Sequence, residues 1–203
     1  MITPTKEMVL FPVCVREYDL RSYYDKDAMW GQLEDMMIKN DGEYALFPDT
    51  HSSYSYEKDI IMKFSKELRG EIMGAINDYS KASGFKRQGY AESWFNVGMY
   101  GAETSPHKHS GCIMSATFYP IFEEGSSNLV VERQLPAELK PVDQFTSSHG
   151  GIDTPYNMAE YEIPIKEGHI YVWPAWLRHK CYMNTSNRRV MIGINTWNKK
   201  GSR

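Results

Sequence analysis

Two histidines separated by a single lysine are the clearest chemical feature of this 203-residue chain. His107 and His109 lie in the stretch SPHKHSG, residues 105–111. Residues i and i+2 of a β-strand point to the same side of the sheet, so in an extended segment both imidazoles would face one place. The pair would then offer two ligands to one metal ion. The alternative is a polar loop that carries two histidines by chance, because short motif matches are common.

A third histidine follows a second spacing motif. Gly101, five residues, His107, one residue and His109 are similar to the opening of the first motif of cupin-type jelly rolls. Residues 168–179, GHIYVWPAWLRH, resemble the second cupin motif, except that a tryptophan stands where a glycine is usual. A jelly roll brings residues about 70 apart in sequence to one mouth, so His179 is predicted as the third ligand.

The carboxylate ligand of the cupin pattern is missing. Cupins carry a glutamate four or five residues after the HxH pair, where this chain has Ile113 and Met114. Three neutral imidazoles leave an octahedral Fe(II), Mn(II) or Zn(II) about three open positions, and imidazole suits iron and zinc equally. The ligand set alone therefore does not name the metal. Asp143 and Asp153 could supply a carboxylate from a long loop, although most loop aspartates cap turns.

The remaining histidines are weaker candidates. His51 and His149 are expected to be solvated in polar loops, and His169 stands at a turn before a strand. Metal binding is therefore expected to be independent of all three.

Two adjacent arginines begin a strand downstream of His179. Arg188 and Arg189 stand nine and ten residues after that histidine. We expect Arg189 to face inward, because its side of the strand includes a small residue where a bound molecule must fit. Alternation places Met191, Gly193 and Asn195 on that side, and Val190, Ile192 and Ile194 on the side of Arg188. The alternative is an exposed edge that two charges keep soluble.

Three segments together resemble one family. GMYGAETSPHKHSGCIMSATFYPI, WPAWLRH and RRVMIGIN are similar to the phage and bacterial group of 2OG-Fe(II) oxygenases. The pattern of that group is an HxH, a serine-rich strand ending in tyrosine, a Phe/Trp-Pro-x-Trp/Phe-Leu-x-His segment, and an arginine before a strand that ends in asparagine. The resemblance spans most of the chain in order. It implies a double-stranded β-helix that binds Fe(II) and 2-oxoglutarate.

The resemblance also implies roles for individual residues. His107 takes the first ligand position, His179 takes the distal one, and His109 stands where better-studied relatives carry an aspartate. Arg189 would bind the C5 carboxylate of 2-oxoglutarate through two parallel hydrogen bonds. Tyr119 is similar in position to a tyrosine that binds the same carboxylate; the alternative is a core tyrosine whose hydroxyl is satisfied by the backbone.

The leading prediction is a dioxygenase that uses Fe(II), 2-oxoglutarate and O2 to hydroxylate a substrate. Asn96 could face the same pocket as the cosubstrate, on strand alternation alone. Two alternatives remain open: a three-histidine cupin dioxygenase that needs no oxo acid, and a non-catalytic metal-binding jelly roll. The arginine pair favours the oxygenase, whereas the absence of an HxD motif favours the alternatives. Nothing in the sequence identifies the substrate.

An α+β chain is expected to position these residues. A strand is predicted over residues 8–15, helices over about 25–40 and 59–82, and a loop over 44–56. Beyond residue 85, short extended runs are separated by Gly, Pro, Ser and Asn, which is typical of a jelly roll.

This order of elements predicts how the chain is organised. Residues 1–84 are expected to form an N-terminal strand and helical layer, and residues 85–203 a jelly-roll core, joined in one compact unit. Residues 134–156 are too irregular for a strand and too long for a simple turn, so this segment is a candidate lid.

The composition limits the partners that we expect. The formal charge is −3 with a sequence pI near 6.1, which does not indicate nucleic acid as a partner. No apolar stretch approaches the ~20 residues of a membrane span. Three widely spaced cysteines indicate neither a disulfide framework nor a zinc knuckle, and they fit a cytoplasmic protein. A homodimer is compatible with the sequence.

Overall fold

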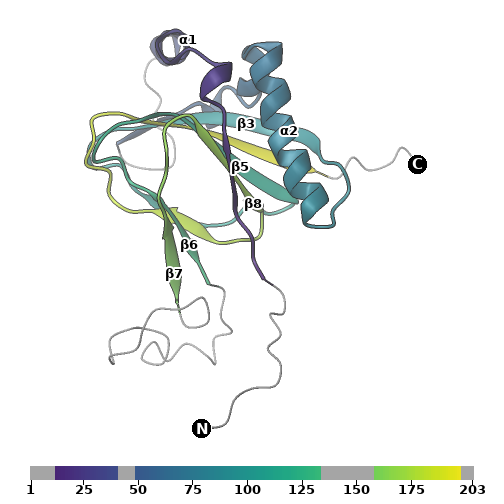
Figure 1. Ribbon diagram of the computed structural model, residues 1–203. Helices are drawn as coiled ribbons and strands as arrows, with labels where there is room; N and C mark the ends of the chain where they lie inside the picture. Colours follow the sequence, from purple (N-terminus) through teal and green to yellow (C-terminus); the bar gives the residue numbers. More distant parts are fainter. Residues whose placement is uncertain (1–11, 41–48, 134–157, 198–203) are drawn as a thin grey trace, which may run out of the picture.

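Two antiparallel sheets form the core of the computed structural model, which describes residues 12–40, 49–133 and 158–197 (Figure 1). The larger sheet has the order β1 (Arg16–Asp19), β8 (His169–Pro174), β5 (Met114–Phe122), β10 (Arg189–Trp197), β3 (Gly89–Gly98), β2 (Thr50–Ser52). The smaller sheet has the order β4 (Thr104–His107), β9 (His179–Cys181), β6 (Leu129–Glu132), β7 (Glu160–Ile163). This arrangement confirms the predicted double-stranded β-helix.

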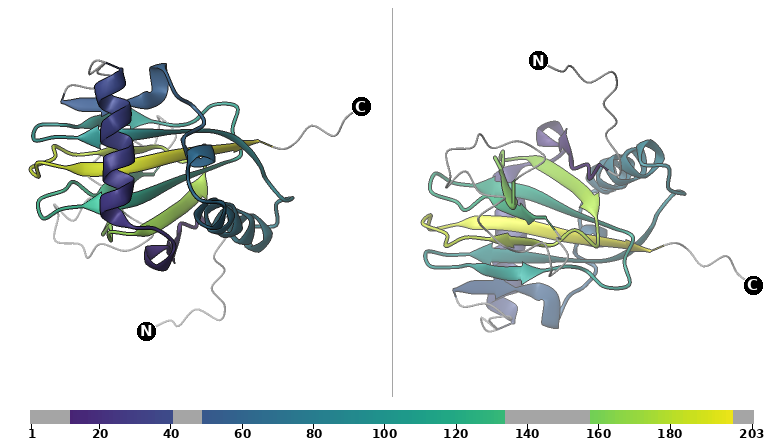
Figure 2. Two further views of the ribbon diagram at one scale, coloured as in Figure 1. Left: turned by 90° about the horizontal axis from the view of Figure 1, so that it is seen from above. Right: turned by 90° about the horizontal axis from the view of Figure 1, so that it is seen from below.

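Two helices cover the outer face of the larger sheet, and Figure 2 shows α1 (Lys26–Lys39) lying across its strands. This helix begins as predicted, because the Asp25 carboxylate accepts a hydrogen bond from the Ala28 backbone N–H at 2.8 Å. The second helix, α2, spans Lys66–Ala82 and not residues 59–82. It begins later because the Ser65 hydroxyl caps it, accepting from the Leu68 N–H at 3.1 Å. The residues before this cap form a separate 3₁₀ turn, η3 (Ile60–Lys63).

Strand alternation in β10 separates two apolar cores. Val190, Ile192 and Ile194 are buried in the core between the larger sheet and the helices. The opposite side of β10 carries Met191, which packs against a second core between the two sheets. Because successive strand residues point to opposite faces, one face of β10 stabilises the helical layer and the other lines the interior of the β-helix.

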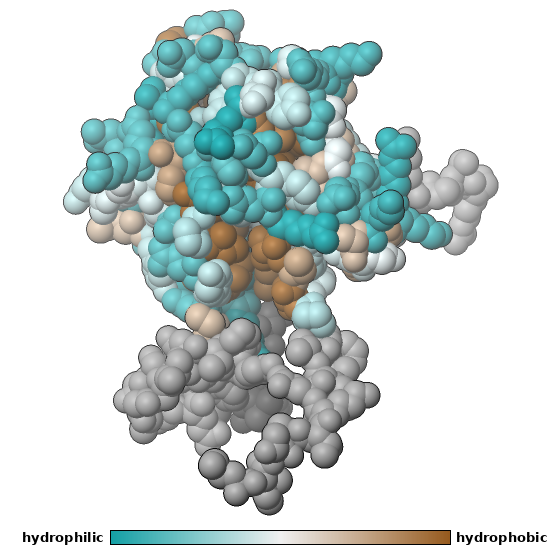
Figure 3. Space-filling view, in the orientation of Figure 1, coloured by the Kyte–Doolittle hydropathy of each residue, from teal (hydrophilic) through white to brown (hydrophobic). Residues whose placement is uncertain are grey.

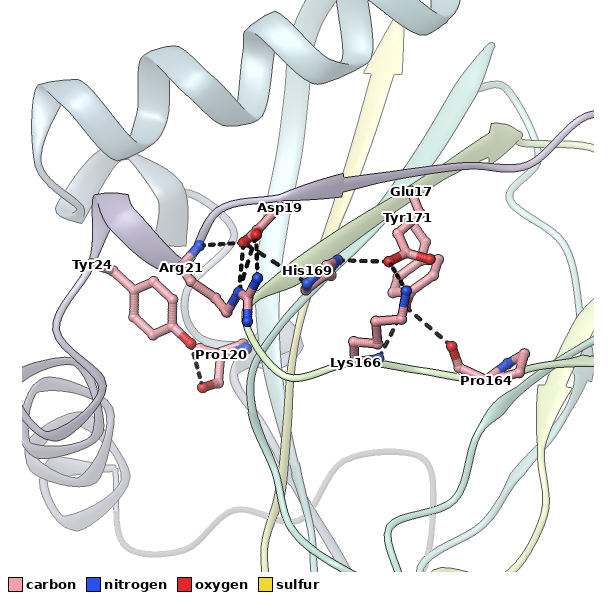
Figure 4. Close-up of polar contacts among 9 residues, drawn as sticks. All are labelled: Glu17, Asp19, Arg21, Tyr24, Pro120, Pro164, Lys166, His169 and Tyr171. Atoms are coloured by element: carbon pink, nitrogen blue, oxygen red, sulfur yellow. Dashed lines mark hydrogen bonds and ion pairs between the residues drawn. The ribbon is translucent and has the colours of Figure 1, made fainter.

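The first strand lies later in the chain than predicted. Residues 12–15 form no strand, residues 8–11 lie outside the described ranges, and β1 pairs with the outer edge of β8. Its side chains are mostly charged, as is usual for an edge strand. Glu17 contacts Lys166 at 2.8 Å and His169 Nδ1 at 2.7 Å, and Asp19 pairs with Arg21 (Figure 4). These ion pairs stabilise β1 at its observed position. The apolar run in the sequence had predicted the strand earlier, over residues 8–15.

The predicted loop over residues 44–56 was wrong for its second half. Thr50–Ser52 form β2, which extends the sheet beyond β3. The expectation that His51 is solvated was also wrong, since it is 2% exposed. Its Nε2 lies 2.8 Å from the Tyr56 hydroxyl, and its ring stacks on Phe95 at 5.8 Å. His51 is therefore a core residue.

Most of the face drawn in Figure 3 is hydrophilic, and its largest apolar area lies near the beginning of β1. Val15 in that segment packs against the core between the sheets. No helix within the described ranges is long and apolar enough to cross a membrane.

Gly193 permits a close contact that sequence reasoning did not anticipate. A Cβ added at this position would lie 2.6 Å from the Trp94 ring, so the space that we expected for a bound molecule is filled by indole. We expect Gly193→Ala to lower the free energy of unfolding by about 1–3 kcal/mol, because overpacking displaces a buried ring. Urea denaturation would measure this.

The control for that variant is Gly31→Ala in α1. A Cβ at Gly31 would meet nothing within 4 Å. Alanine is the better helix former, so this variant should be stabilised by up to about 1 kcal/mol. Equal stability of Gly193→Ala and the parent would show that Trp94 moves without cost.

Candidate metal and cosubstrate site

Three histidines converge at the mouth of the β-helix. His107, His109 and His179 each offer one ligand atom, and these atoms lie within 4.8 Å of one another. The Nε2 atoms of His109 and His179 are 3.3 Å apart. Within the described ranges, this is the only group of three or more His, Cys, Asp or Glu side chains arranged closely enough to hold a metal ion.

Two short strands bring these histidines together. β4 and β9 are antiparallel neighbours, and their register places His107 directly opposite His179. His109 follows the end of β4, and its backbone N–H donates to the Ala175 carbonyl at 3.0 Å. Each strand has only three or four residues and no apolar alternation, so a linear pattern carries little signal of either. The pairing between them explains how side chains so far apart in sequence become neighbours.

Backbone carbonyls orient two of the rings. His107 Nδ1 lies 2.9 Å from the Ser105 carbonyl oxygen, and His179 Nδ1 lies 2.9 Å from the Leu177 carbonyl oxygen. A neutral imidazole whose Nδ1–H donates to a carbonyl leaves its Nε2 lone pair free. This is the usual outer hydrogen bond of a metal-binding histidine.

Burial keeps two of the imidazoles neutral. Burial, together with the nearby His107, lowers the pKa of His109 to about 4 and that of His179 to about 3. Neutral imidazole is the form that binds metals. His109 and His179 are therefore in their ligating form at neutral pH.

These pKa values predict how the metal-free protein responds to acid. A histidine in the unfolded chain has a pKa near 6.5 and is protonated below about pH 6.5. In the folded protein, His109 and His179 stay neutral down to a lower pH, so the unfolded chain binds more protons. The free energy of unfolding should fall as the pH drops from about 6.5 towards 4, by about 1.4 kcal/mol per pH unit for each histidine. Urea denaturation of metal-free protein at several pH values would measure the slope. His179→Gln should reduce this slope by about 1.4 kcal/mol per pH unit, because one proton fewer is taken up on unfolding. An unchanged slope would contradict the prediction.

A polar network lies behind His109. Asn195 Nδ2 is 3.5 Å from His109 Nδ1 and donates to the Glu92 carboxylate at 2.9 Å. Ser115 Oγ donates to Asn195 Oδ1 at 2.9 Å. Sequence alternation had placed Asn195 on this side of β10, but it gave no sign of Glu92, which lies opposite Asn195 in the register of β3. The Glu92 carboxylate thus contacts the neighbour of His109 and is not one of the three groups that could bind a metal.

Arg189 is a buried cation. It is 5% exposed, and among the described residues no carboxylate pairs with it. Its Nη2 lies 3.1 Å from Cys181 Sγ, its Nη1 lies 3.6 Å from Met191 Sδ, and its guanidinium lies 5.3 Å from the centre of the Tyr119 ring. Sulfur is a weak acceptor, so these contacts compensate little of the cost of burying a charge. The site is therefore suited to an anion.

The neighbouring Arg188 lies in a different environment. Its guanidinium pairs with Glu123 at 3.0 Å and stacks over Trp30 at 4.7 Å. Alternation along β10 thus separates the two arginines, one into the interior and one onto the surface.

Tyr119 and Asn96 line the same pocket as the three histidines. Tyr119 is 1% exposed, and burial raises the pKa of its hydroxyl well above the usual range, so it stays protonated. Asn96 Oδ1 is buried and has no hydrogen-bond partner in the part of the chain that the structure describes. Arg189 borders a smaller adjoining pocket, which shares Asn96, Thr104, Cys181 and Met191 with the first.

The other candidate ligands do not join this group. His51 and His169 are buried elsewhere, beside Tyr56 and Glu17 respectively. His149, Asp143 and Asp153 lie outside the described residues, as does the candidate lid over residues 134–156.

A family model described as "Putative 2OG-Fe(II) oxygenase" matches residues 92–195, which include every histidine, arginine and tyrosine of the site. The chain belongs to this oxygenase family. Its cofactor is Fe(II) and its cosubstrate is 2-oxoglutarate, and it is an Fe(II)- and 2-oxoglutarate-dependent oxygenase. The alternatives of a cupin without an oxo acid and of a non-catalytic jelly roll are therefore set aside. No curated protein sequence matches the chain.

Solved structures of other oxygenases share the fold. HygX from Streptomyces hygroscopicus, with nickel and 2-oxoglutarate bound, is 9% identical with a TM-score of 0.53, over 92% of this chain and 83% of HygX. A prolyl-4-hydroxylase from Pseudomonas putida is 11% identical with a TM-score of 0.52, over 91% of this chain and 92% of that chain. The viral collagen prolyl hydroxylase of Paramecium Bursaria Chlorella virus-1, in its 2-oxoglutarate complex, is 10% identical with a TM-score of 0.52, over 90% and 94%. At these identities the likeness concerns the fold.

Proposed function

We propose that His107, His109 and His179 bind the Fe(II) of this oxygenase and that Arg189 binds the distal carboxylate of 2-oxoglutarate. The observation that carries the proposal is the buried Arg189 guanidinium, which lacks a carboxylate partner among the described residues and lies beside the three-histidine pocket. A dicarboxylate with one end at the histidines and the other at Arg189 would neutralise that charge. A bidentate guanidinium–carboxylate contact is the usual solution.

Residues around the pocket support this assignment chemically. Three imidazoles fit Fe(II), and the protonated Tyr119 hydroxyl can donate to a carboxylate oxygen. We assign Asn96 to the same cosubstrate region. Bound Fe(II) supplies the redox chemistry by which 2-oxoglutarate and O2 are converted to succinate and CO2 while a substrate is oxidised. Trp94 and Leu129 line the pocket and limit the access of water.

The experiment that tests the proposal is anaerobic titration of 2-oxoglutarate into the Fe(II)-loaded protein. A visible charge-transfer absorption should appear as the 2-oxo acid end reaches the metal, and succinate should form once O2 is admitted. Oxalate, a chelator without a distal carboxylate, should bind the metal in both the parent and Arg189→Ala. Failure of 2-oxoglutarate to bind the parent would overturn the assignment.

The finer aspects of the reaction and setting are also proposals. We propose hydroxylation with O2, a cytoplasmic location, and a place in the phage and bacterial group of the family. The three free cysteines are compatible with a reducing compartment. Homodimer formation stays a prediction that sedimentation analysis would decide.

A further inference from the structure

Three buried polar atoms of residues that line the smaller pocket beside the site have no hydrogen-bond partner. They are Arg189 Nε, Asn96 Oδ1 and Ser127 Oγ, considered within residues 12–40, 49–133 and 158–197. A buried donor or acceptor that makes no hydrogen bond destabilises the folded state, most strongly when it belongs to a charged group. Each of the three atoms therefore needs a hydrogen-bond partner other than the described protein groups.

The three residues line one small pocket. It lies between β3, which carries Asn96, the segment before β6, which carries Ser127, and the first residue of β10, which is Arg189. About 10 Å³ is open to the centre of a water molecule. That is about the room that one water needs.

The hydrogen-bonding capacity of the three atoms identifies the occupant. Arg189 Nε–H can only donate and Asn96 Oδ1 can only accept, whereas Ser127 Oγ can do either. A carboxylate oxygen would leave Asn96 Oδ1 facing a second acceptor. A water molecule accepts from Arg189, donates to Asn96 and bonds to Ser127, so it satisfies all three atoms.

Asn184 connects two of the segments that surround this pocket. Asn184 is 1% exposed, and its Oδ1 accepts from the Ser127 backbone N–H at 3.1 Å. Its Nδ2 donates to the Met99 carbonyl at 2.9 Å, just beyond the end of β3. Asn184 thereby links the segment of Ser127 to the end of the strand that carries Asn96.

We propose that one buried water bridges Arg189 Nε, Asn96 Oδ1 and Ser127 Oγ, and that Ser127 and Asn96 are positioning residues for the cosubstrate arginine. The water would bond to Nε of Arg189. Nη1 and Nη2 contact the sulfur atoms of Met191 and Cys181, and both of these residues line the histidine pocket. The two Nη groups are then oriented towards the space that the distal carboxylate would occupy. This role rests on the proposed function of Arg189, whereas the water itself does not.

Three substitutions at Ser127 test the proposal in the full-length, Fe(II)-loaded protein. Ser127→Val puts a methyl group where the hydroxyl would bond the water and so expels the water, and the dissociation constant for 2-oxoglutarate should rise about tenfold. Ser127→Ala should have a smaller effect of about threefold, because the water keeps its other two partners. Ser127→Thr keeps the hydroxyl and should stay close to the parent. Ser83→Val, at the exposed end of α2, is the surface control and should leave the dissociation constant for 2-oxoglutarate unchanged.

Oxalate separates positioning from general damage to the fold. It carries no distal carboxylate, so its affinity should be the same in the parent and in all Ser127 variants. Equal losses for oxalate and 2-oxoglutarate, or no loss for 2-oxoglutarate in Ser127→Val, would overturn the positioning role.

A crystal structure that resolves ordered waters tests the site directly. We expect one water within hydrogen-bond distance of all three atoms in the parent and none in Ser127→Val. An empty space, or a cosubstrate oxygen in that space, would overturn the proposal. If the parent bound no 2-oxoglutarate, the proposed function of Arg189 would fail, while the presence or absence of the water would still decide this inference.

Discussion

In the Arg189→Ala variant, 2-oxoglutarate binding to the Fe(II)-loaded protein weakens by tens of fold or more, whereas Fe(II) affinity stays nearly that of the parent. The guanidinium is buried and has no carboxylate partner among the described residues, so a bound carboxylate would make charge-assisted hydrogen bonds in a largely dry site. Such contacts contribute on the order of 2 kcal/mol or more. Anaerobic calorimetry with metal-loaded protein measures both affinities.

Arg188→Ala is the matched control for this result. Arg188 pairs with Glu123 and stacks over Trp30, away from the histidines. Its removal should change 2-oxoglutarate affinity little, because a partly exposed ion pair contributes about 0–1 kcal/mol. A larger loss at Arg188 than at Arg189 would show that the cosubstrate approaches from the opposite face of β10.

The second large effect is expected at the metal. His179→Ala should weaken Fe(II) binding by more than about 100-fold, since losing even an outer partner of a ligand costs about 10- to 100-fold. His107→Ala and His109→Ala should also lower the affinity sharply, because each removes one of three imidazoles that lie within 4.8 Å of one another. Anaerobic Fe(II) titration with a competing chelator would give the dissociation constants.

His51→Ala and His169→Ala are the controls for the metal prediction. Both side chains are buried at other places in the fold, beside Tyr56 and Glu17, so their loss should lower stability without changing Fe(II) affinity. His149→Ala is also expected to leave Fe(II) affinity unchanged. If His109→Ala bound iron as tightly as the parent, the third ligand would have to be sought elsewhere in the chain.

Local sequence was sufficient for several elements of this protein. Asp25 marks the beginning of α1, because its side chain caps a free backbone N–H whatever surrounds it. The alternation of β10 separates Arg189 from Arg188, because a strand places successive side chains on opposite faces. Two spacing motifs also named three histidines that the fold brings together. These features depend on neighbours within a few residues, and a linear pattern records them.

Other features depended on the tertiary structure. β1 and β2 lie on the edges of a sheet whose inner strands are supplied by residues far along the chain, so their short polar sequences carry little signal of their own. The strands β4 and β9 exist because they pair with one another, and that pairing places His107 opposite His179.

The positions of the side chains inside the pocket also depend on the tertiary structure. Trp94 fills the space over Gly193, and Ser127 approaches Arg189 from a connecting segment with no motif. Contacts between segments far apart in sequence depend on sheet register and side-chain packing. Neither is encoded in the spacing of nearby residues, so the sequence could name three histidines as candidate metal ligands but not the residues that surround and orient them.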